Sequence, residues 1–295
     1  MNDAEGVRTG PVLVFDIETV PDVAGIRRIH DVPAAMPDAD VLAWHAQLRR
    51  SQTGSDFTPH ALQKIVAIAC ALREGPRFKI ASVGEIDDDE PELIRRFFEI
   101  IDRCTPQLVS WNGGGFDLPV LHYRSMLHGV TAARYWDWGD DDRDFKFNNY
   151  LSRYHTRHLD LMDVLAQFQP RLYTGLDTMA RLCGFPGKLG MAGAEVAKAV
   201  GEGRLAEVRA YCETDVLNTF FLYQRFRLMR GELDAGAYAA ELSLARERVA
   251  ASEAAHWKAY LAAWQGAPAV DNAVAAQESL PLAANAASAP GVADG

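Results

Sequence analysis

The chain has 295 residues, of which 48% are hydrophobic, and a formal net charge of −10 at pH 7. This size and composition allow one large core with appendages, and the acidic balance argues against a protein that coats nucleic acid through a broad positive face, because that mode needs many Lys and Arg contacts to phosphate. A narrow site, in which carboxylates bind a polyanion through metal ions, stays open.

The first predicted element is a strand over residues 12–21, "VLVFDIETVP". Alternate side chains point to opposite faces, which places Leu13, Phe15 and Ile17 on one face and Val12, Val14, Asp16 and Glu18 on the other. Apolar residues on both faces indicate a central strand covered on both sides. Residues 22–60 have mixed polarity, and we expect an insertion there with a short helix around "DADVLAWHAQLRR".

Two further β-type runs, "IVAIACALREG" and "RFKIASVG", are separated by a Gly-Pro turn signal and predict a hairpin. Apolar residues at helical spacing then predict a helix in "ELIRRFFEIIDRC". A strand at "QLVSWN", a helix at "LPVLHYRSMLHG" and a strand at "HLDLM" follow. This order favours a parallel right-handed crossover. The expected fold class is therefore α/β, with a mixed five-stranded sheet flanked by helices.

Helices are also predicted around "LDTMARLCG" and "AGAEVAKAV", and a long one over "RLAEVRAYCETDVLNTFFLYQRFRLMRG". The composition from 233 to 263 predicts one more helix, outside the core. Residues 265–295 contain no aromatic residue, Lys or Arg, so we expect a disordered tail. The expected organisation is a flexible N-terminus (1–10), one domain (11–231) with the insertion 22–60, a helical extension (232–264) and the tail.

Asp16 and Glu18 point the same way, about 7 Å apart, at the exit of the first strand. Two close carboxylates share a proton, pair with a basic residue or hold a cation. No basic residue lies within this strand, and oxygen ligands favour Mg²⁺ or Mn²⁺. A solvated strand end with ordinary acidic residues is the alternative.

The long helix carries a third carboxylate, Asp215, in its apolar stripe: Leu205, Val208, Cys212, Asp215, Thr219, Leu222, Phe226 and Met229. An unpaired carboxylate facing the sheet would be costly. Tyr211, four residues earlier, projects from the same side. The alternative is a core tyrosine beside an aspartate that pairs with an arginine.

A fourth carboxylate, Asp117, follows the glycine run in "SWNGGGFDLP". By itself it reads as a simple N-cap, with Pro119 in the first turn. Three glycines after a strand, however, allow a ligand to approach closely, and open α/β sheets place their sites at the carboxyl ends of their strands. We therefore expect Asp117 at the same end of the sheet as a ligand.

The set "FDIET", "WNGGGFDLP" and "YCETD" resembles the three motifs of the 3′→5′ proofreading exonuclease domain of family-B DNA polymerases, in the tyrosine-containing branch of the DEDD superfamily, and the stand-alone bacterial proteins related to it. The resemblance covers about residues 11 to 231. It implies a ribonuclease-H-like fold and hydrolysis by two metal ions.

By this resemblance, Asp16, Glu18 and Asp215 would bind the catalytic metal, and Asp16 would bridge to a second metal supported by Asp117. The two ions, Mg²⁺ or Mn²⁺, would sit about 4 Å apart. Tyr211 would orient the attacking water, because an unperturbed pKa near 10 favours hydrogen-bond positioning over proton abstraction.

The resemblance also places Thr19 near the terminal nucleotide, Asn112 near its sugar or phosphate and Phe116 near the end bases. Lys188, in "GFPGKLGMAG", is expected to meet a phosphate. Residues 143–158 interleave basic and aromatic side chains, which is typical either of a single-strand groove or of a partly packed connector. A second metal set at positions 155, 158 and 160 is less favoured than a supporting role for Asp160.

The expected function is a metal-dependent 3′→5′ exonuclease acting on nucleic-acid 3′ ends, with single-stranded DNA favoured and RNA open, that releases nucleoside 5′-monophosphates. One alternative is a catalytically silent nucleic-acid-binding module. Another is an aspartate-nucleophile phosphatase of the haloacid-dehalogenase type, with "DIETV" and "WGDDD" as its acidic motifs. The C-terminal extension is expected to offer a surface to a protein partner.

The four cysteines are widely spaced, without a CxxC pair, which favours reduced and packed thiols: Cys70, Cys104, Cys183 and Cys212. The polar N-terminus lacks a secretory apolar core, and no segment approaches about 18 consecutive apolar residues. We therefore expect no membrane association and a cytoplasmic location.

Overall fold

The computed structural model describes residues 10–264. Residues 1–9 and 265–295, which include most of the expected flexible N-terminus and the whole expected tail, lie outside the described part. Within residues 10–264, no helix combines the length and the apolar character needed to span a bilayer.

The fold is built on a five-stranded sheet with the strand order β3-β2-β1-β4-β5. The strands are β1 (Val12–Pro21), β2 (Gln63–Glu74), β3 (Arg77–Ser82), β4 (Gln107–Ser110) and β5 (His158–Asp160). β1, β2 and β3 form an antiparallel meander, while β4 is parallel to both β1 and β5. The mixed α/β sheet predicted from the sequence is confirmed, and its order is that of the ribonuclease-H-like fold.

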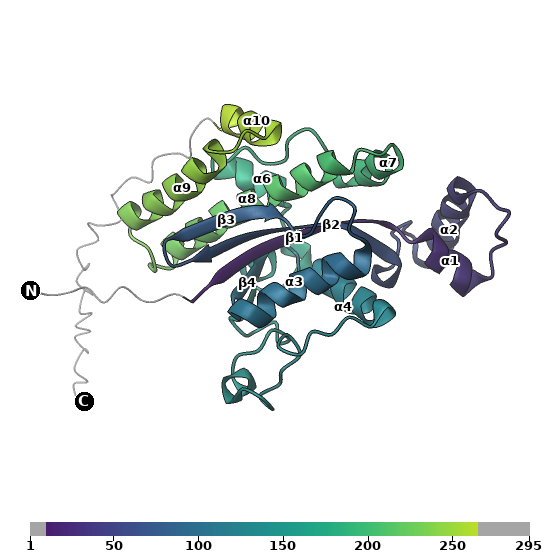
Figure 1. The fold of residues 1–295 in the computed structure, drawn as a ribbon, viewed down its shortest axis with the longest axis horizontal. Helices are drawn as coiled ribbons and strands as arrows, with labels where there is room; N and C mark the ends of the chain where they lie inside the picture. The colour runs from purple at the N-terminus through teal and green to yellow at the C-terminus, as the bar shows by residue number, and fades with distance from the viewer. Residues whose placement is uncertain (1–9, 265–295) are drawn as a thin grey trace, which may run out of the picture.

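The helices that surround the sheet are α1 (Val23–His30), α2 (Asp38–Thr53), α3 (Glu90–Cys104), α4 (Asp117–His128), α5 (Leu161–Leu165), α6 (Leu176–Leu182), α7 (Val196–Gly201), α8 (Leu205–Met229), α9 (Ala235–Ala250) and α10 (Ala255–Ala263). In Figure 1, α3 and α4 lie on one side of the sheet, and α6 to α10 lie on the other. β1 is therefore covered on both faces.

The alternation along β1 separates two hydrophobic clusters, as the sequence predicts. Val12 and Val14 belong to the cluster shared with α8. Leu13, Phe15 and Ile17 belong to the cluster shared with α3 and α4. Since Asp16 alternates with these three residues, its side chain lies on the α8 side of the sheet.

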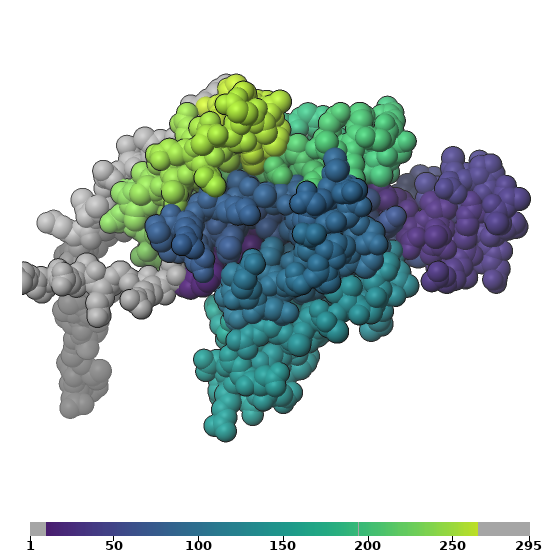
Figure 2. Space-filling view, viewed as in Figure 1, coloured from purple at the N-terminus to yellow at the C-terminus, as the bar shows by residue number. Residues whose placement is uncertain are grey.

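The insertion between β1 and β2 forms a lobe, defined here as residues 22–62, with two helices where the sequence predicts one. Figure 2 shows this lobe projecting from the body of the molecule. It has a small core of its own around Ile26, Val41 and Leu62. A buried arginine of α4 ties the lobe to the body, because Arg124 pairs with Asp22 at 2.7 Å and with Glu90 of α3 at 2.5 Å.

The prediction of one helix outside the core over residues 233–263 is wrong in two respects. The segment forms two helices, α9 and α10, and it contributes Trp257 and Tyr260, followed directly by Trp264, to the cluster that contains α8. Every residue of α8 from 214 to 224 is consequently buried, so the predicted single stripe underestimates its contacts. At the end of that stripe, Met229 is 65% exposed. The proposed domain boundary at residue 231 does not coincide with an edge of this cluster.

The segment 143–158 is packed in part against the body of the protein. Phe145 and Tyr150 are buried in the cluster under α3. The guanidinium groups of Arg134 and Arg157 lie over the Phe145 ring, at 4.6 and 4.0 Å from its centroid. Phe145 and Tyr150 therefore stabilise the segment and are not available to stack on bases. Phe147 and Tyr154 are 82% and 71% exposed, so a single-strand groove at this segment stays a prediction.

Candidate active site

The predicted carboxylates meet where β1 passes between α4 and α8. Asp117 accepts a hydrogen bond from the backbone N–H of Ile17, at 3.0 Å, through Oδ1. This contact places the Asp117 carboxylate against the β1 backbone, between Asp16 and Glu18. The pairing register of β1 with β2 shifts directly after Glu18, and such irregularities re-aim the strand locally.

The N-cap interpretation of Asp117 is wrong. Asp117 is the first residue of α4, and the cap position belongs to Phe116, which makes no side-chain capping bond. The Asp117 side chain instead accepts a hydrogen bond from the β1 backbone, from a residue 100 positions earlier in the sequence. The Asp117 side chain, which is 4% exposed, is therefore buried as part of the site and does not cap the helix.

The glycine run forms a tight loop held by Asp160. The two carboxylate oxygens of Asp160 accept hydrogen bonds from the backbone N–H groups of Asn112 and Gly114, both at 2.9 Å. A Cβ at Gly113 would lie 2.3 Å from the Ser110 hydroxyl, so this position requires glycine. The interpretation of Asp160 as a support from a strand fits this geometry.

α8 supplies Asp215 and Tyr211, which are 2% and 3% exposed. Lys188 joins them, because its ammonium pairs with Asp215 Oδ2 at 2.7 Å and donates a hydrogen bond to the Tyr211 hydroxyl. Among the residues that the structure describes, the buried Oδ1 of Asp215 has no hydrogen-bond partner. The sequence places Lys188 at a phosphate, whereas here it contacts two predicted site residues.

The electrostatics of the site are dominated by burial and by repulsion between carboxylates. Burial, followed by the charges of Asp117, Glu18 and Asp215, raises the pKa of Asp16 well above its usual range. Burial and the Asp215 charge raise the pKa of Glu18 to about 8. Burial also raises the pKa of Asp117 to about 7 and that of Asp215, against the opposing effect of Lys188. The site thus favours binding of positive charge.

Cys212 is a site residue that the sequence reasoning missed. Its thiol lies 3.4 Å from the Asp16 carbonyl oxygen and 3.6 Å from Asp16 Oδ2. Ligand atoms of Asp16, Glu18 and Cys212 all lie within 4.8 Å of one another. Cys212 could have been predicted from its position in the apolar stripe, because it precedes Asp215 by three residues and so lies on the same side of the helix.

The four cysteines are free, as predicted.

The turn that carries Lys188 is fixed by Asn218, which follows Asp215 by three residues and so lies on the same side of α8. Asn218 donates a hydrogen bond through Nδ2 to the Gly187 carbonyl at 2.8 Å, and its Oδ1 accepts one from the Gly187 N–H at 3.3 Å. The same Oδ1 accepts a bond from the Tyr260 hydroxyl of α10 at 2.7 Å. The last helix of the described chain therefore holds the turn beside the carboxylates.

The predicted substrate residues lie around this cluster. Thr19 donates a hydrogen bond to Gln63 Oε1 at 3.0 Å, at the end of β1. Asn112 adopts a left-handed conformation with φ 69° at the start of the glycine loop. Phe116 is half-buried and precedes Asp117 directly.

Two alternative sets are not brought together. His158 contacts the Ser110 hydroxyl at 2.8 Å, while His155 accepts a bond from the backbone N–H of Asn149 through Nδ1 at 3.0 Å. They form no metal set with Asp160. The acidic stretch 139–142, which the phosphatase alternative needs at the site, instead wraps its backbone N–H groups around the Asp137 carboxylate.

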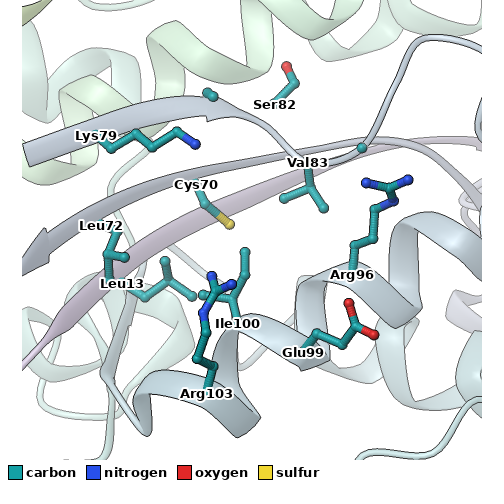
Figure 3. A pocket seen from close by; sticks show the side chains of 12 residues that line it. Leu13, Cys70, Leu72, Lys79, Ser82, Val83, Arg96, Glu99, Ile100 and Arg103 are labelled. Carbon is teal, nitrogen blue, oxygen red and sulfur yellow. The ribbon is translucent and has the colours of Figure 1, made fainter.

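A groove of about 280 Å³ lies on the opposite face of the sheet, between β3 and α3. Figure 3 shows its floor at Cys70 and Leu72 and its rims at Lys79 and Arg103. Leu13, which lines it, belongs to the α3 side of β1. The sheet therefore separates this groove from the carboxylate cluster.

The ribonuclease-H-like sheet and the carboxylate cluster at β1 define an α/β protein of the exonuclease class. Residues 55–264 match the family described as a predicted 3′-5′ exonuclease related to the exonuclease domain of PolB, and the chain belongs to this family. The match includes Asp117, Lys188, Tyr211 and Asp215. It begins downstream of β1.

Two solved structures are similar to this chain. One is the family B DNA polymerase from the hyperthermophilic archaeon Pyrobaculum calidifontis, with 17% identity and a TM-score of 0.43 over 82% of this chain and 29% of the polymerase chain. The other is the zinc-bound complex of E. coli ExoI with ssDNA, with 13% identity and a TM-score of 0.32 over 77% of this chain and 46% of the other. The chain thus spans less than half the length of either protein.

Proposed function

We propose that this exonuclease is metal-dependent, removes nucleotides from the 3′ ends of single-stranded DNA and releases nucleoside 5′-monophosphates. One observation carries the proposal: Asp16, Glu18, Asp117 and Asp215 converge from three separate elements, and the charges of the other three raise the pKa of Asp16. Such a cluster repels itself unless it binds protons or cations.

The donor set fits divalent cations, because Mg²⁺ and Mn²⁺ prefer carboxylate oxygens. The buried and unpartnered Oδ1 of Asp215 is a ligand atom without another use among residues 10–264. We assign Asp16, Glu18 and Asp215 to one cation, and Asp16 and Asp117 to a second. When bound, such cations lower the pKa of water and stabilise the charge on the leaving oxygen.

Tyr211 and Lys188 act as positioning groups in this proposal. Burial and the Asp215 charge raise the pKa of Tyr211, so its phenol stays protonated at neutral pH and serves as a hydrogen-bond donor rather than a base. The Asp215 and Tyr211 contacts outweigh burial and raise the pKa of Lys188, so Lys188 stays charged. A cation held by Asp215 would displace the Lys188 ammonium, which would then be free to pair with a substrate phosphate.

The test uses 5′-labelled single-stranded DNA and RNA with Mg²⁺, Mn²⁺ or EDTA. We expect a ladder that shortens from the 3′ end only with metal, and its loss in Asp215→Asn. Glu99→Gln is the matched control, because Glu99 lines the groove on the other face of the sheet. Internal cuts or full activity in EDTA would overturn the proposal, and DNA binding without cleavage would favour a silent binding module.

A further inference from the structure

Three aromatic side chains meet at the junction of the lobe and the glycine loop. Phe57 and His60 come from the end of the lobe, and Phe116 comes from the residue before Asp117. Their ring centroids lie 6.2 Å apart for Phe57 and Phe116, and 5.6 Å apart for each ring with His60. We call these three residues the aromatic platform.

The platform is held at the glycine loop by hydrogen bonds. His60 Nε2 contacts the Gly115 carbonyl oxygen at 3.0 Å. Gln63, which accepts a bond from Thr19, donates one to the Thr58 carbonyl oxygen at 3.0 Å. The backbone directly after Phe57, at Thr58, is therefore linked through Gln63 to Thr19, and the His60 side chain is linked to the loop before Asp117. Thr19 and this loop are both parts of the candidate site.

Phe57 is the outer member of the platform. It is 46% exposed, whereas His60 and Phe116 are half-buried. The three ring pairs meet at 52° to 65°, so no pair forms a closed parallel stack and ring faces remain open. An exposed aromatic ring on a fixed backbone beside a nuclease site has the geometry of a base-stacking surface.

We propose that the aromatic platform binds the unpaired bases immediately upstream of the 3′-terminal nucleotide, with Phe57 as a specificity-determining residue supplied by the lobe. This inference rests on the proposed function. Stacking needs the face of an unpaired base, so the platform selects single strands that extend beyond the terminal nucleotide. Since every base has a π-face, the selection is independent of sequence.

The experiment compares two substrates with the full chain and Mg²⁺ or Mn²⁺. One is a 5′-labelled single-stranded oligodeoxynucleotide, and the other is the p-nitrophenyl ester of thymidine 5′-monophosphate, which has no upstream base. Stacking of one base on an aromatic ring changes affinity by a factor of roughly 5 to 150. Phe57→Ala should lower kcat/KM for the oligonucleotide about tenfold, mainly through KM, and leave the ester unchanged. Phe57→Trp should keep oligonucleotide activity.

Ile29→Ala is the control, because Ile29 is an exposed apolar residue of α1 in the same lobe, outside the platform. An equal loss on both substrates, no loss on the oligonucleotide, or the same loss in Ile29→Ala would overturn the inference. If the wild type cleaves neither substrate, the proposed function fails. Fluorescence anisotropy of the labelled oligonucleotide in Ca²⁺ then tests the platform separately. Weaker binding by Phe57→Ala than by the wild type supports the inference, and equal binding overturns it.

Discussion

Replacing Glu18 by glutamine should stabilise the metal-free protein. Glu18 is 9% exposed, and burial together with the Asp215 charge raises its pKa from 4.5 to about 8. The unfolded chain ionises this group freely, whereas the folded protein must keep it protonated at neutral pH. This cost is about 1.4 kcal/mol for each pH unit above the unfolded pKa, and it reaches about 3 kcal/mol at pH 7. Glutamine removes the cost without changing the shape of the side chain.

The sign of the pH dependence follows from the raised pKa. Between pH 4.5 and about 8 the folded protein binds more protons at Glu18 than the unfolded chain does, so the free energy of unfolding falls as the pH rises through this window. In Glu18→Gln this contribution disappears. The advantage of the variant over the wild type should therefore be absent near pH 4.5 and largest near pH 8.

Urea unfolding in EDTA at several pH values measures the effect, with Glu99→Gln as an exposed control expected to change stability by less than about 1 kcal/mol. Addition of saturating Mg²⁺ should stabilise the wild type and not Glu18→Gln, because only the wild type retains the full ligand set. The reasoning is refuted if Glu18→Gln is no more stable than the wild type at pH 8 in EDTA, or if wild-type stability does not fall with pH.

Three other substitutions test separate parts of the structure. Tyr211→Phe should lower kcat about 100-fold with little change in KM, because the phenol positions the reacting groups; steady-state kinetics with an unchanged kcat would contradict this role. Gly113→Ala should cost about 1–3 kcal/mol in urea unfolding, because the new Cβ would lie 2.3 Å from the Ser110 hydroxyl. Arg124→Met should cost about 3–5 kcal/mol, because it removes the guanidinium that pairs with the buried Glu90 carboxylate and leaves this carboxylate only the His128 imidazole and the Ile65 N–H; the double variant with Glu90→Gln should recover part of that loss, and no recovery would argue against the pair.

The parts of the site that local pattern determines could be predicted from the sequence. The two-residue period of β1 places Asp16 on the α8 side of the sheet, and the helical period of α8 places Tyr211 beside Asp215. The glycine run marks a close backbone approach, and Gly113 does lie against Ser110. These inferences need only the geometry of a single element.

The features that sequence reasoning missed depend on contacts between distant segments. The place of Asp117 in the site was expected from the glycine run and the family resemblance, but its hydrogen bond to the β1 backbone, 100 residues earlier, cannot be predicted from its own helix. The packing of α10 against α8 is similarly invisible in a segment rich in Ala and Glu. Its Trp257 and Tyr260 are buried because α8 presents apolar residues on its outer side as well.

The hydrogen bonds from Tyr260 through Asn218 to Gly187 link α10, the last helix among residues 10–264, to the turn that carries Lys188. A chain cut after residue 231 would keep every carboxylate of the candidate site, and it would still contain the complete five-stranded sheet. It would lose the Tyr260 hydroxyl that orients Asn218, and with it one of the contacts that position the turn of Lys188. In the proposed mechanism, the stretch needed for full activity is therefore longer than the one that contains the recognisable motifs.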